Sequence, residues 1–314
     1  MSIPQLRPDL LAEPAARAAR LVARERVRAV DDAYERFCAH KKDALHDLRV
    51  ALRRLRSWIR AYQPVLDDTL RRRTRRGLAD LARATNLARD GEVWLEWTEA
   101  QRGLSPHGRA AKAHMAKRLS ATCDQTARAA GVQLAKRLPR TARGIDAQLS
   151  YYWLRVSVDR RDPEPTMAHV ASQLVRRHTD ELVKAVRRVR SSADVVRIHR
   201  ARIAGKHLRY LIEPLAADAR TAHAIDRLRA LQDRLGVFHD ARLLADWVRA
   251  EMDRVARRPV LQRGLAELLE RARADQHASY LWFRQSWNVR GRRGVLKSIR
   301  GIASELRTAP GATR

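Results

Sequence analysis

Cysteine and long apolar segments are both scarce in this chain. Its 314 residues include two cysteines, Cys38 and Cys123, which stand far apart and form no C-x-x-C pair. This usage speaks against a disulfide framework. No stretch reaches the roughly 18 apolar residues of a membrane span, and the opening MSIPQLRPDLLAEP has no apolar run long enough for a signal peptide. We therefore expect a soluble protein of the cytoplasm with no membrane partner.

Glycine and proline are sparse as well, at 13 and 11 positions, and sustained alternation of apolar and polar residues is missing. Glycine and proline mark turns, and an alternation of apolar and polar residues marks a half-buried strand. Alanine, leucine, arginine and glutamate, which favour helices, dominate instead. The sequence therefore predicts an all-α fold. We expect helices over residues 9–40, 42–63, 66–86, 89–102, 106–137, 141–157, 165–190, 194–215, 219–236, 239–257, 259–288 and 292–306, and a disordered tail over 306–314.

Acidic residues are too few to balance the basic ones. Lys and Arg total 65 against 35 Asp and Glu, so the formal net charge is +30, and all but eight of the basic residues are Arg. Such a charge destabilises a compact chain unless anions gather on it. GC-rich codons also raise arginine content, but the guanidinium group is a planar fork of donors that fits phosphate. We therefore expect a polyanionic partner.

Aromatic residues make up only 5% of the chain. Trp94, Trp97, Trp247 and Tyr210 stand at the spacing of helix core positions and are not interleaved with arginine. A platform for stacking nucleic-acid bases needs that interleaving. We therefore expect these rings to pack in the core.

One segment, LHDLRVALRRLRSWIRAY at residues 45–62, combines an apolar and a basic series in helical rhythm. The apolar series is Leu45, Leu48, Leu52, Leu55 and Ile59. The basic series, called the first ridge below, is His46, Arg49, Arg53, Arg56 and Arg60. On a helix the two series lie about 100° apart, so the cations border the buried side.

A second segment of the chain repeats this pattern. IHRARIAGKHLRYLI at residues 198–212 aligns with 45–59, and LQDRLGVFHDARLLADW at 231–247 aligns with LARATNLARDGEVWLEW at 81–97. The second ridge is thus His199, Arg202, Lys206 and Arg209, and its apolar companions are Ile198, Ala201, Gly205, Leu208 and Ile212. Two repeats favour a duplication over a solenoid. We expect one domain over 9–305, made of pseudo-symmetric helical bundles at 9–158 and 165–305.

A run of charge on a helix is most often a solvated face or a set of scattered ion pairs. The RRRTRR run at 71–76 is interpreted in that way. The two ridges differ because they have almost no acid three or four residues away, so that like charges repel. If both ridges faced the seam between the halves, they would form a cationic groove or tunnel.

These segments resemble the CHAD family, the conserved-histidine α-helical domain, and the resemblance extends from about residue 9 to 305. It implies two helical bundles around a basic central channel that binds inorganic polyphosphate. Carried over by position, the implied contacts are His46, Arg49, Arg53, Arg56 and Arg89 in the first half and His199, Arg202, Lys206, Arg209 and His239 in the second. The first ridge itself adds Arg60. The turn TNLARD at 85–90 lacks the glycine of LGVFHD at 235–240, and His239 replaces Arg89.

Motifs for catalysis or metal binding are missing. The chain has no E-x-E pair of a triphosphatase strand, no G-x-x-x-x-G-K-[ST] loop and no H-E-x-x-H. Asp47 and Asp240 follow histidines directly, and adjacent helix residues do not face each other, so we interpret both acids as helix caps or partners of nearby arginines. For His46 and His199 phosphate contact and a satisfied, partly buried imidazole stay open, and a metal role is disfavoured.

The prediction is therefore a non-enzymatic polyphosphate binder without cofactors, associating with polyphosphate granules or with polyphosphate-metabolising enzymes. Two alternatives stay open. One is a nucleic-acid-binding protein, because +30 attracts any duplex without regard to sequence. The other is a phosphohydrolase with an unrecognised site.

Overall fold

The computed structural model describes residues 8–41, 43–67, 69–150, 164–215 and 218–308. Within these ranges the regular structure is helical, with one isolated bridge between Pro14 and Thr166. The α-helices are α1 Pro8–Ala12, α2 Ala15–Cys38, α3 Ala44–Ala61, α4 Gln63–Leu66, α5 Arg72–Ala84, α6 Asn86–Ala100, α7 Pro106–Ser150, α8 Met167–Arg187, α9 Val195–Ile212, α10 Ala219–Arg254, α11 Pro259–Ser286 and α12 Arg293–Thr308. A 3₁₀ turn, η2 Glu213–Leu215, follows α9. The predicted all-α class is confirmed.

Two predicted interruptions are wrong. A break was expected between residues 137 and 141, but α7 continues through Pro139 to Ser150. Leu138 and Ala142 on either side of this proline are buried, and their packing holds the helix in spite of the missing backbone donor. The predicted break between 236 and 239 is absent too, because α10 continues through Gly236, which is buried inside the helix. Residues 151–157 of the expected helix 141–157 lie outside the described part of the chain.

Other boundaries shift in the opposite direction. The helix expected over 9–40 is divided at Pro14 into α1 and α2. The helix expected over 66–86 begins only at Arg72, and the short α4 occupies the expected break before it. The expected turn at 85–90 is the start of α6 at Asn86. The tail was expected to begin at 306, but α12 extends to Thr308; residues 309–314 lie outside the described ranges.

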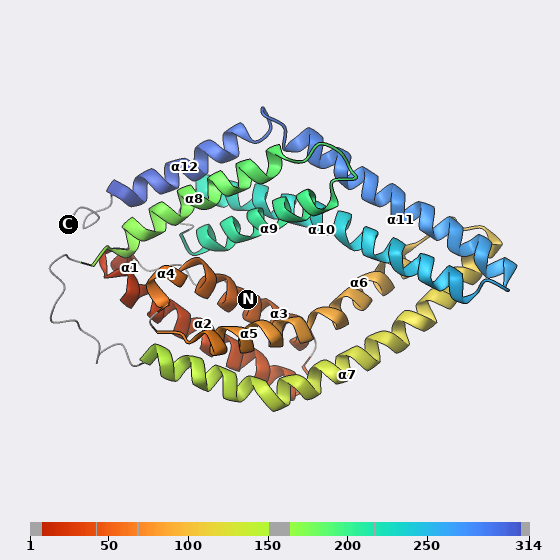
Figure 1. Cartoon of the computed structure of the whole chain (residues 1–314), viewed down its shortest axis with the longest axis horizontal. Coiled ribbons are helices and arrows are strands. Elements are labelled where there is room, and N and C mark those ends of the chain that lie inside the picture. Colours follow the sequence, from red (N-terminus) through yellow and green to blue (C-terminus); the bar gives the residue numbers. More distant parts are fainter. Residues whose placement is uncertain (1–7, 42, 68, 151–163, 216–217, 309–314) are drawn as a thin grey trace.

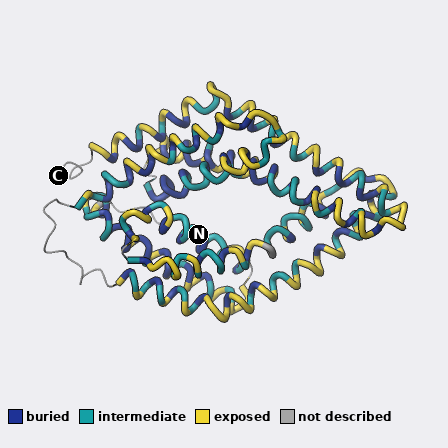
Figure 2. Tube along the Cα trace, in the orientation of Figure 1, coloured by how far each residue is buried: buried dark blue, intermediate teal, exposed yellow. Residues whose placement is uncertain are grey.

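The helices form an elongated body in which α3 and α9 pack against each other in the middle (Figure 1). Helices α8 and α12 run along one long side, and α2, α5 and α7 along the other. At one narrow end α6, α7, α10 and α11 pack together. Buried residues line the sides of the helices that face their neighbours (Figure 2). This arrangement places the segment 45–59 directly against the segment 198–212.

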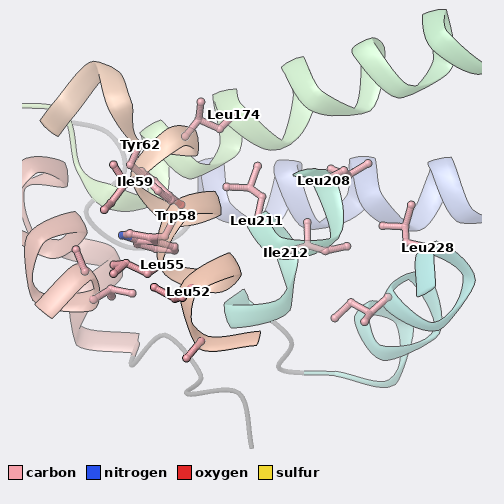
Figure 3. Packing of buried hydrophobic residues seen from close by; sticks show 14 of the residues in the cluster. Leu52, Leu55, Trp58, Ile59, Tyr62, Leu174, Leu208, Leu211, Ile212 and Leu228 are labelled. Carbon is pink, nitrogen blue, oxygen red and sulfur yellow. The ribbon is translucent and has the colours of Figure 1, made fainter. Parts of the chain in front are cut away.

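The apolar series that border the two ridges form the centre of the core. Leu48, Leu52, Leu55 and Ile59 are buried and Leu45 is partly buried. The companion residues Ile198, Ala201, Gly205, Leu208 and Ile212 are all buried. Figure 3 shows Leu52, Leu55 and Ile59 of α3 together with Leu208, Leu211 and Ile212 of α9 in one cluster. The predicted core positions of both segments are thus confirmed.

A second apolar cluster occupies the narrow end. It joins Ala111, Met115 and Leu119 of α7 to Leu244 and Val248 of α10. Leu265, Leu268 and Ala272 of α11 complete it. This cluster therefore takes residues from both predicted halves and is not the core of either one. The duplication itself stays a prediction.

The starts of α2 and α8 are also joined directly. The Ala15 amide donates to the Pro165 carbonyl at 2.9 Å, and the Met167 amide donates to the Glu13 carbonyl at 2.8 Å. In addition, the Thr166 hydroxyl caps α8 by accepting from the His169 amide at 3.3 Å. These bonds fix the two N-terminal ends side by side.

None of the described helices combines the length and the apolar character needed to cross a bilayer.

Candidate anion-binding site

The two ridges face each other because α3 and α9 pack together through the apolar series beside them. The rhythm of each segment leaves the cations on the flank of the contact, where they are only partly exposed. On α3 the residues Arg49, Arg53 and Arg56 are half-buried, whereas His46 and Arg60 are exposed. On α9 the residues Arg202, Lys206 and Arg209 are half-buried and His199 is exposed.

Lys206 lies at the centre of the assembled cations. Burial first, and then four neighbouring arginines, lower its pKa from the usual 10.5 to about 7. These neighbours are Arg53 and Arg56 of the first ridge and Arg202 and Arg209 of the second. Because residues of both ridges lower the pKa of one amine, the fold brings the two ridges together.

Arg89, near the start of α6, joins the same group. Burial lowers the pKa of Arg53, and the positive charge of Arg89 lowers it further, whereas the negative charge of an ionised Tyr210 hydroxyl raises it. Burial likewise lowers the pKa of Arg202, and Arg89 acts on it in the same direction. We call Arg53, Arg89, Arg202, Lys206 and Arg209 the central cluster.

Several buried N–H donors of the ridges have no acceptor. Among the described residues these include Nε and Nη1 of Arg49, Nε of Arg53 and Nε of Arg202. A buried donor that loses its water without gaining a partner costs roughly 1–3 kcal/mol. Such groups call for an explanation, and an anion between the ridges supplies one.

Two of the ridge arginines do have acidic partners. Arg49 Nη2 donates to Glu92 Oε2 at 2.8 Å, and Arg209 Nη1 donates to Glu213 Oε1 at 2.7 Å. Arg209 Nε also donates to Gln232 Oε1 at 3.0 Å. Glu213 stands four residues after Arg209 in the sequence, a spacing that predicts an ion pair on one helix face. Glu92 approaches Arg49 only in the tertiary structure.

Tyr210 belongs both to the core and to the cluster. It is 6% exposed, as expected of a core residue. Two guanidinium groups lie near its ring, that of Arg209 at 4.5 Å and that of Arg53 at 5.9 Å from the centroid. The face of the ring attracts cations, so Tyr210 helps to hold Arg53 and Arg209 at the site.

A pocket of about 570 Å³ opens beside Lys206, between α3, α5 and α9. Arg53, Arg56 and Arg60 line it from α3, and Lys206 and His207 line it from α9. Arg72, Arg75 and Arg76 line it from α5. Arg72 and Arg76 are exposed, as expected of a solvated face, and Arg75 is half-buried. All three nevertheless line this pocket, because α5 packs beside α3. The sequence offered no signal for this contact.

His46 lies away from the cluster. It lines a separate pocket of about 500 Å³ with Arg49, Glu92 and the segment between α2 and α3. Its neighbour Asp47 forms an ion pair with Arg36 Nη1 at 3.0 Å, which confirms the expectation that this acid bonds to an arginine.

His199 and His239 are brought together, with ring centroids 5.2 Å apart. Burial and then Arg202 lower the pKa of both imidazoles. Nearby, burial and the charge of Asp240 raise the pKa of Asp90, while Arg89 opposes this shift. Beside the two histidines, the arginines Arg89 and Arg202 are thus accompanied by the carboxyl groups of Asp90 and Asp240.

Three of the tryptophans lie away from the ridges, at the second apolar cluster. Trp94, Trp97 and Trp247 pack against it, and the rings of Trp94 and Trp247 are 6.4 Å apart. Trp97 Nε1 donates to Asp275 Oδ2 at 2.7 Å. Their predicted core packing is confirmed. Across the described part of the chain, no three His, Cys, Asp or Glu side chains gather as metal ligands would.

Two solved structures share this architecture. The CHAD domain from the plant Ricinus communis has a TM-score of 0.62 at 23% identity, with 99% of this chain and 96% of that chain covered. PptA from Streptomyces chartreusis has a TM-score of 0.65 at 17% identity, with 88% and 99% covered. At such identities the likeness shows the fold alone.

No curated protein sequence matches the chain. The CHAD domain model, however, matches residues 15–249, which contain both ridges, Arg89 and His239. Since this match covers more than half of the sequence and the fold agrees with a CHAD domain structure, the resemblance seen in the ridges is confirmed, and the chain belongs to the CHAD domain family.

Proposed function

We propose that the protein binds inorganic polyphosphate, without cleaving it, between the two ridges. The observation that carries this proposal is the set of buried guanidinium donors on Arg49, Arg53 and Arg202 that have no acceptor in the described structure. They come from both α3 and α9, and two of these arginines, Arg53 and Arg202, belong to the central cluster. An extended anion with oxygens along its whole length would satisfy donors on both helices at once.

Charge density supports the choice of a phosphate polymer. Burial and then the charges of four arginines lower the pKa of Lys206, and these like charges repel one another when the site is empty. Several adjacent phosphoryl groups would neutralise it together, whereas a single small anion would offset only part of that charge. Membership of the CHAD family, which the resemblance associates with polyphosphate, points to the same ligand.

Nucleic acid is a poorer fit. Trp94, Trp97 and Trp247 pack against the second apolar cluster, and the buried Tyr210 has two guanidinium groups near its ring. Phosphate contacts without base contacts give binding that ignores sequence. We therefore infer that RNA and DNA bind only non-specifically, through the overall positive charge.

A binding role without catalysis accounts for the acids as well. Glu92 and Glu213 are engaged by Arg49 and Arg209 and serve to position these arginines. Tethering of polyphosphate would place the protein on polyphosphate granules in the cytoplasm, or beside the enzymes that build and degrade the polymer.

A competition measurement tests the proposal. The full chain is titrated with fluorescently labelled long-chain polyphosphate at physiological salt, with unlabelled polyphosphate, RNA and DNA as competitors. We expect polyphosphate to compete at least about tenfold better per phosphate than either nucleic acid. Equal competition would contradict the proposal in favour of nucleic-acid binding, and release of inorganic phosphate in the presence of Mg²⁺ would favour a phosphohydrolase.

Matched variants separate the site from bulk charge. Arg53→Gln with Arg56→Gln removes two cations from the first ridge. The control, Arg128→Gln with Arg140→Gln, removes two exposed arginines of α7 that do not line the pocket beside Lys206. A charge-assisted hydrogen bond contributes roughly 1.5–3 kcal/mol, so the ridge pair should weaken binding by at least about tenfold. The α7 pair should change it by less than about threefold. Equal losses would show that net charge alone governs binding.

A further inference from the structure

Lys206 differs from the other lysines of the chain. There are eight lysines in the sequence, and among those that the structure describes Lys206 is the one whose pKa is lowered, to about 7. The amine is thus half neutral near pH 7, whereas an ordinary lysine is almost fully protonated there. A neutral amine is a nucleophile, and a site next to other cations is one of the known ways to produce it.

The surroundings of this amine are built for a phosphoryl group. Lys206 lines the pocket of about 570 Å³ together with arginines from α3 and α5, among them Arg56, Arg60 and Arg76. Guanidinium forks hold a phosphate dianion by paired hydrogen bonds. A small molecule that carries both a phosphoryl group and an electrophilic carbon would therefore be held with that carbon close to the amine.

We propose that Lys206 is a modification site for acyl phosphates, the class to which acetyl phosphate belongs. The arginines of the pocket hold the phosphoryl group, and the Lys206 amine attacks the adjacent carbonyl carbon. A bond forms between the amine nitrogen and the carbonyl carbon. The bond between that carbon and the oxygen it shares with phosphorus breaks. The bonding pair leaves with inorganic phosphate, and the proton of the amine passes to water. The products are an amide on Lys206 and free phosphate, so no oxidant or reductant is needed.

The charged groups around Lys206 set the pH range of this reaction. Arg53 and Arg56 face it from α3, Arg202 and Arg209 from α9, and the α5 arginines from across the pocket. Burial and then Arg60 lower the pKa of the adjacent His207 to about 4, so this imidazole is neutral at pH 7. A bound phosphoryl dianion raises the pKa of Lys206 again, so its acylation rate should level off between pH 7 and 10.5.

Acylation would also change the central cluster. An amide carries no charge, so the modified protein loses the cation that both ridges surround. Here the inference rests on the proposed function: modification at Lys206 would lower the affinity for polyphosphate. The protein would then release its polymer when acyl phosphates are abundant.

Peptide mass spectrometry after incubation of the full chain with acetyl phosphate at pH 7.5 tests the modification. The exposed lysines Lys41 and Lys184 are internal controls. We expect Lys206 to be acetylated about tenfold faster than either, because of its larger neutral fraction. A rate at Lys206 no higher than at Lys41 and Lys184 would overturn the proposal.

A second donor isolates the role of the phosphoryl group. Inorganic phosphate should slow the reaction of Lys206 with acetyl phosphate more strongly than its reaction with p-nitrophenyl acetate, which has no phosphoryl group, because phosphate raises the pKa of the amine in both cases but competes for the arginines only with acetyl phosphate. Equal inhibition of both reactions, or of neither, would contradict capture through the phosphoryl group.

The effect on polyphosphate is measured separately. Affinity is compared before and after acetyl phosphate treatment, in the wild type and in Lys206→Arg, which keeps a cation but removes the nucleophile. We expect treatment to weaken wild-type binding by about tenfold and to leave the variant at its own untreated value. Acetylated Lys206 with unchanged affinity would overturn the regulatory role and count against polyphosphate binding at this cluster, while the modification itself would stand.

Discussion

Lys206 makes polyphosphate binding a proton-linked process. In the free protein its pKa is about 7, so above this pH the amine is largely neutral. Phosphate oxygens beside it favour the ammonium form and raise the pKa in the complex. Binding above pH 7 therefore takes up a proton, and the affinity should decrease as the pH rises from 7 toward the pKa of the complex.

Calorimetry in buffers of different ionisation enthalpy measures this uptake. We expect about one proton per bound site at pH 8.5 and a clearly smaller number at pH 6, where Lys206 is already charged. In Lys206→Arg the uptake at pH 8.5 should vanish, because arginine stays protonated in both states. Uptake at pH 8.5 that persists in this variant would assign the proton to another group.

The same shift acts on folding without ligand. The unfolded chain keeps the ordinary lysine pKa of 10.5 and the folded chain has about 7, so the unfolded state binds more protons between these values. The contribution of Lys206 to stability therefore rises with pH across this window. It is the burial of Lys206 among arginines that causes this dependence.

At the level of single residues, the sequence predicted the identity of the cations better than their partners. The spacing of Arg53, Arg202 and Lys206 indicated that they share helix faces, and the structure places them in one cluster. The approach of Arg72 from α5 to the same pocket was not predictable, since it depends on how two helices pack. The role of these residues in binding stays a prediction.

Among the helices, α9 provides the counterpart to the α3 variants. Arg202→Gln with Lys206→Gln should weaken polyphosphate binding by at least about tenfold, as is expected of Arg53→Gln with Arg56→Gln, because both ridges would contact the same polymer. Arg209 is avoided here because its removal would leave the buried Glu213 without its ion-pair partner and so destabilise the fold. The same titration measures the affinity, with circular dichroism as the control for helix content. A loss from the α3 pair alone would place the ligand on one ridge.

The packing of α11 on α7 makes a separate prediction about stability. A Cβ atom on Gly264 would overlap the backbone carbonyl of His107 and lie 2.7 Å from the Ala111 methyl group. Gly264→Ala should therefore destabilise the fold by roughly 1–3 kcal/mol. Gly144→Ala in α7 is the control, because its Cβ meets nothing within 4 Å. There the helix propensity of alanine should add roughly 0.5–1 kcal/mol. Urea denaturation measures both, and a stabilised Gly264→Ala would contradict the observed packing.

The course of the long helices shows the limit of local signals. Pro139 and Gly236 are the kinds of residue that end helices in isolation. Both lie within continuous helices here, because the flanking residues Leu138 and Leu235 are buried in the main core. The helical class, the ridges and the apolar series depend on periodicity and were predictable. The continuity of α7 and α10 depends on tertiary packing and was not.

For the molecule as a whole, the charge of +30 predicts that anions stabilise the fold. Polyphosphate that binds only the folded state at a concentration of 100 times its Kd adds about 2.7 kcal/mol. The melting temperature should therefore rise with polyphosphate and, to a smaller extent, with sulfate. Differential scanning fluorimetry measures this shift, and an unchanged melting curve at saturating polyphosphate would contradict binding to the folded state.

The salt dependence of binding reports how many phosphates are contacted. The logarithm of the affinity should fall linearly with the logarithm of salt concentration, with a slope that grows with the number of neutralised phosphates. Titrations between about 50 and 200 mM salt measure this slope. The Arg53→Gln, Arg56→Gln variant should show a shallower one, and a flat response in the wild type would contradict contact by the ridges.

The second apolar cluster has a consequence for synthesis of the chain on the ribosome. Ala111, Met115 and Leu119 of α7 are covered by Leu244 and Val248 of α10 and by Leu265 and Leu268 of α11. About 100 residues must therefore be translated after α7 before its partners exist, which takes roughly 5–20 seconds. During that time one face of α7 is open to solvent and to other nascent chains. Folding of this end is completed late, and a truncated first half would keep an adhesive apolar surface that the finished protein does not show.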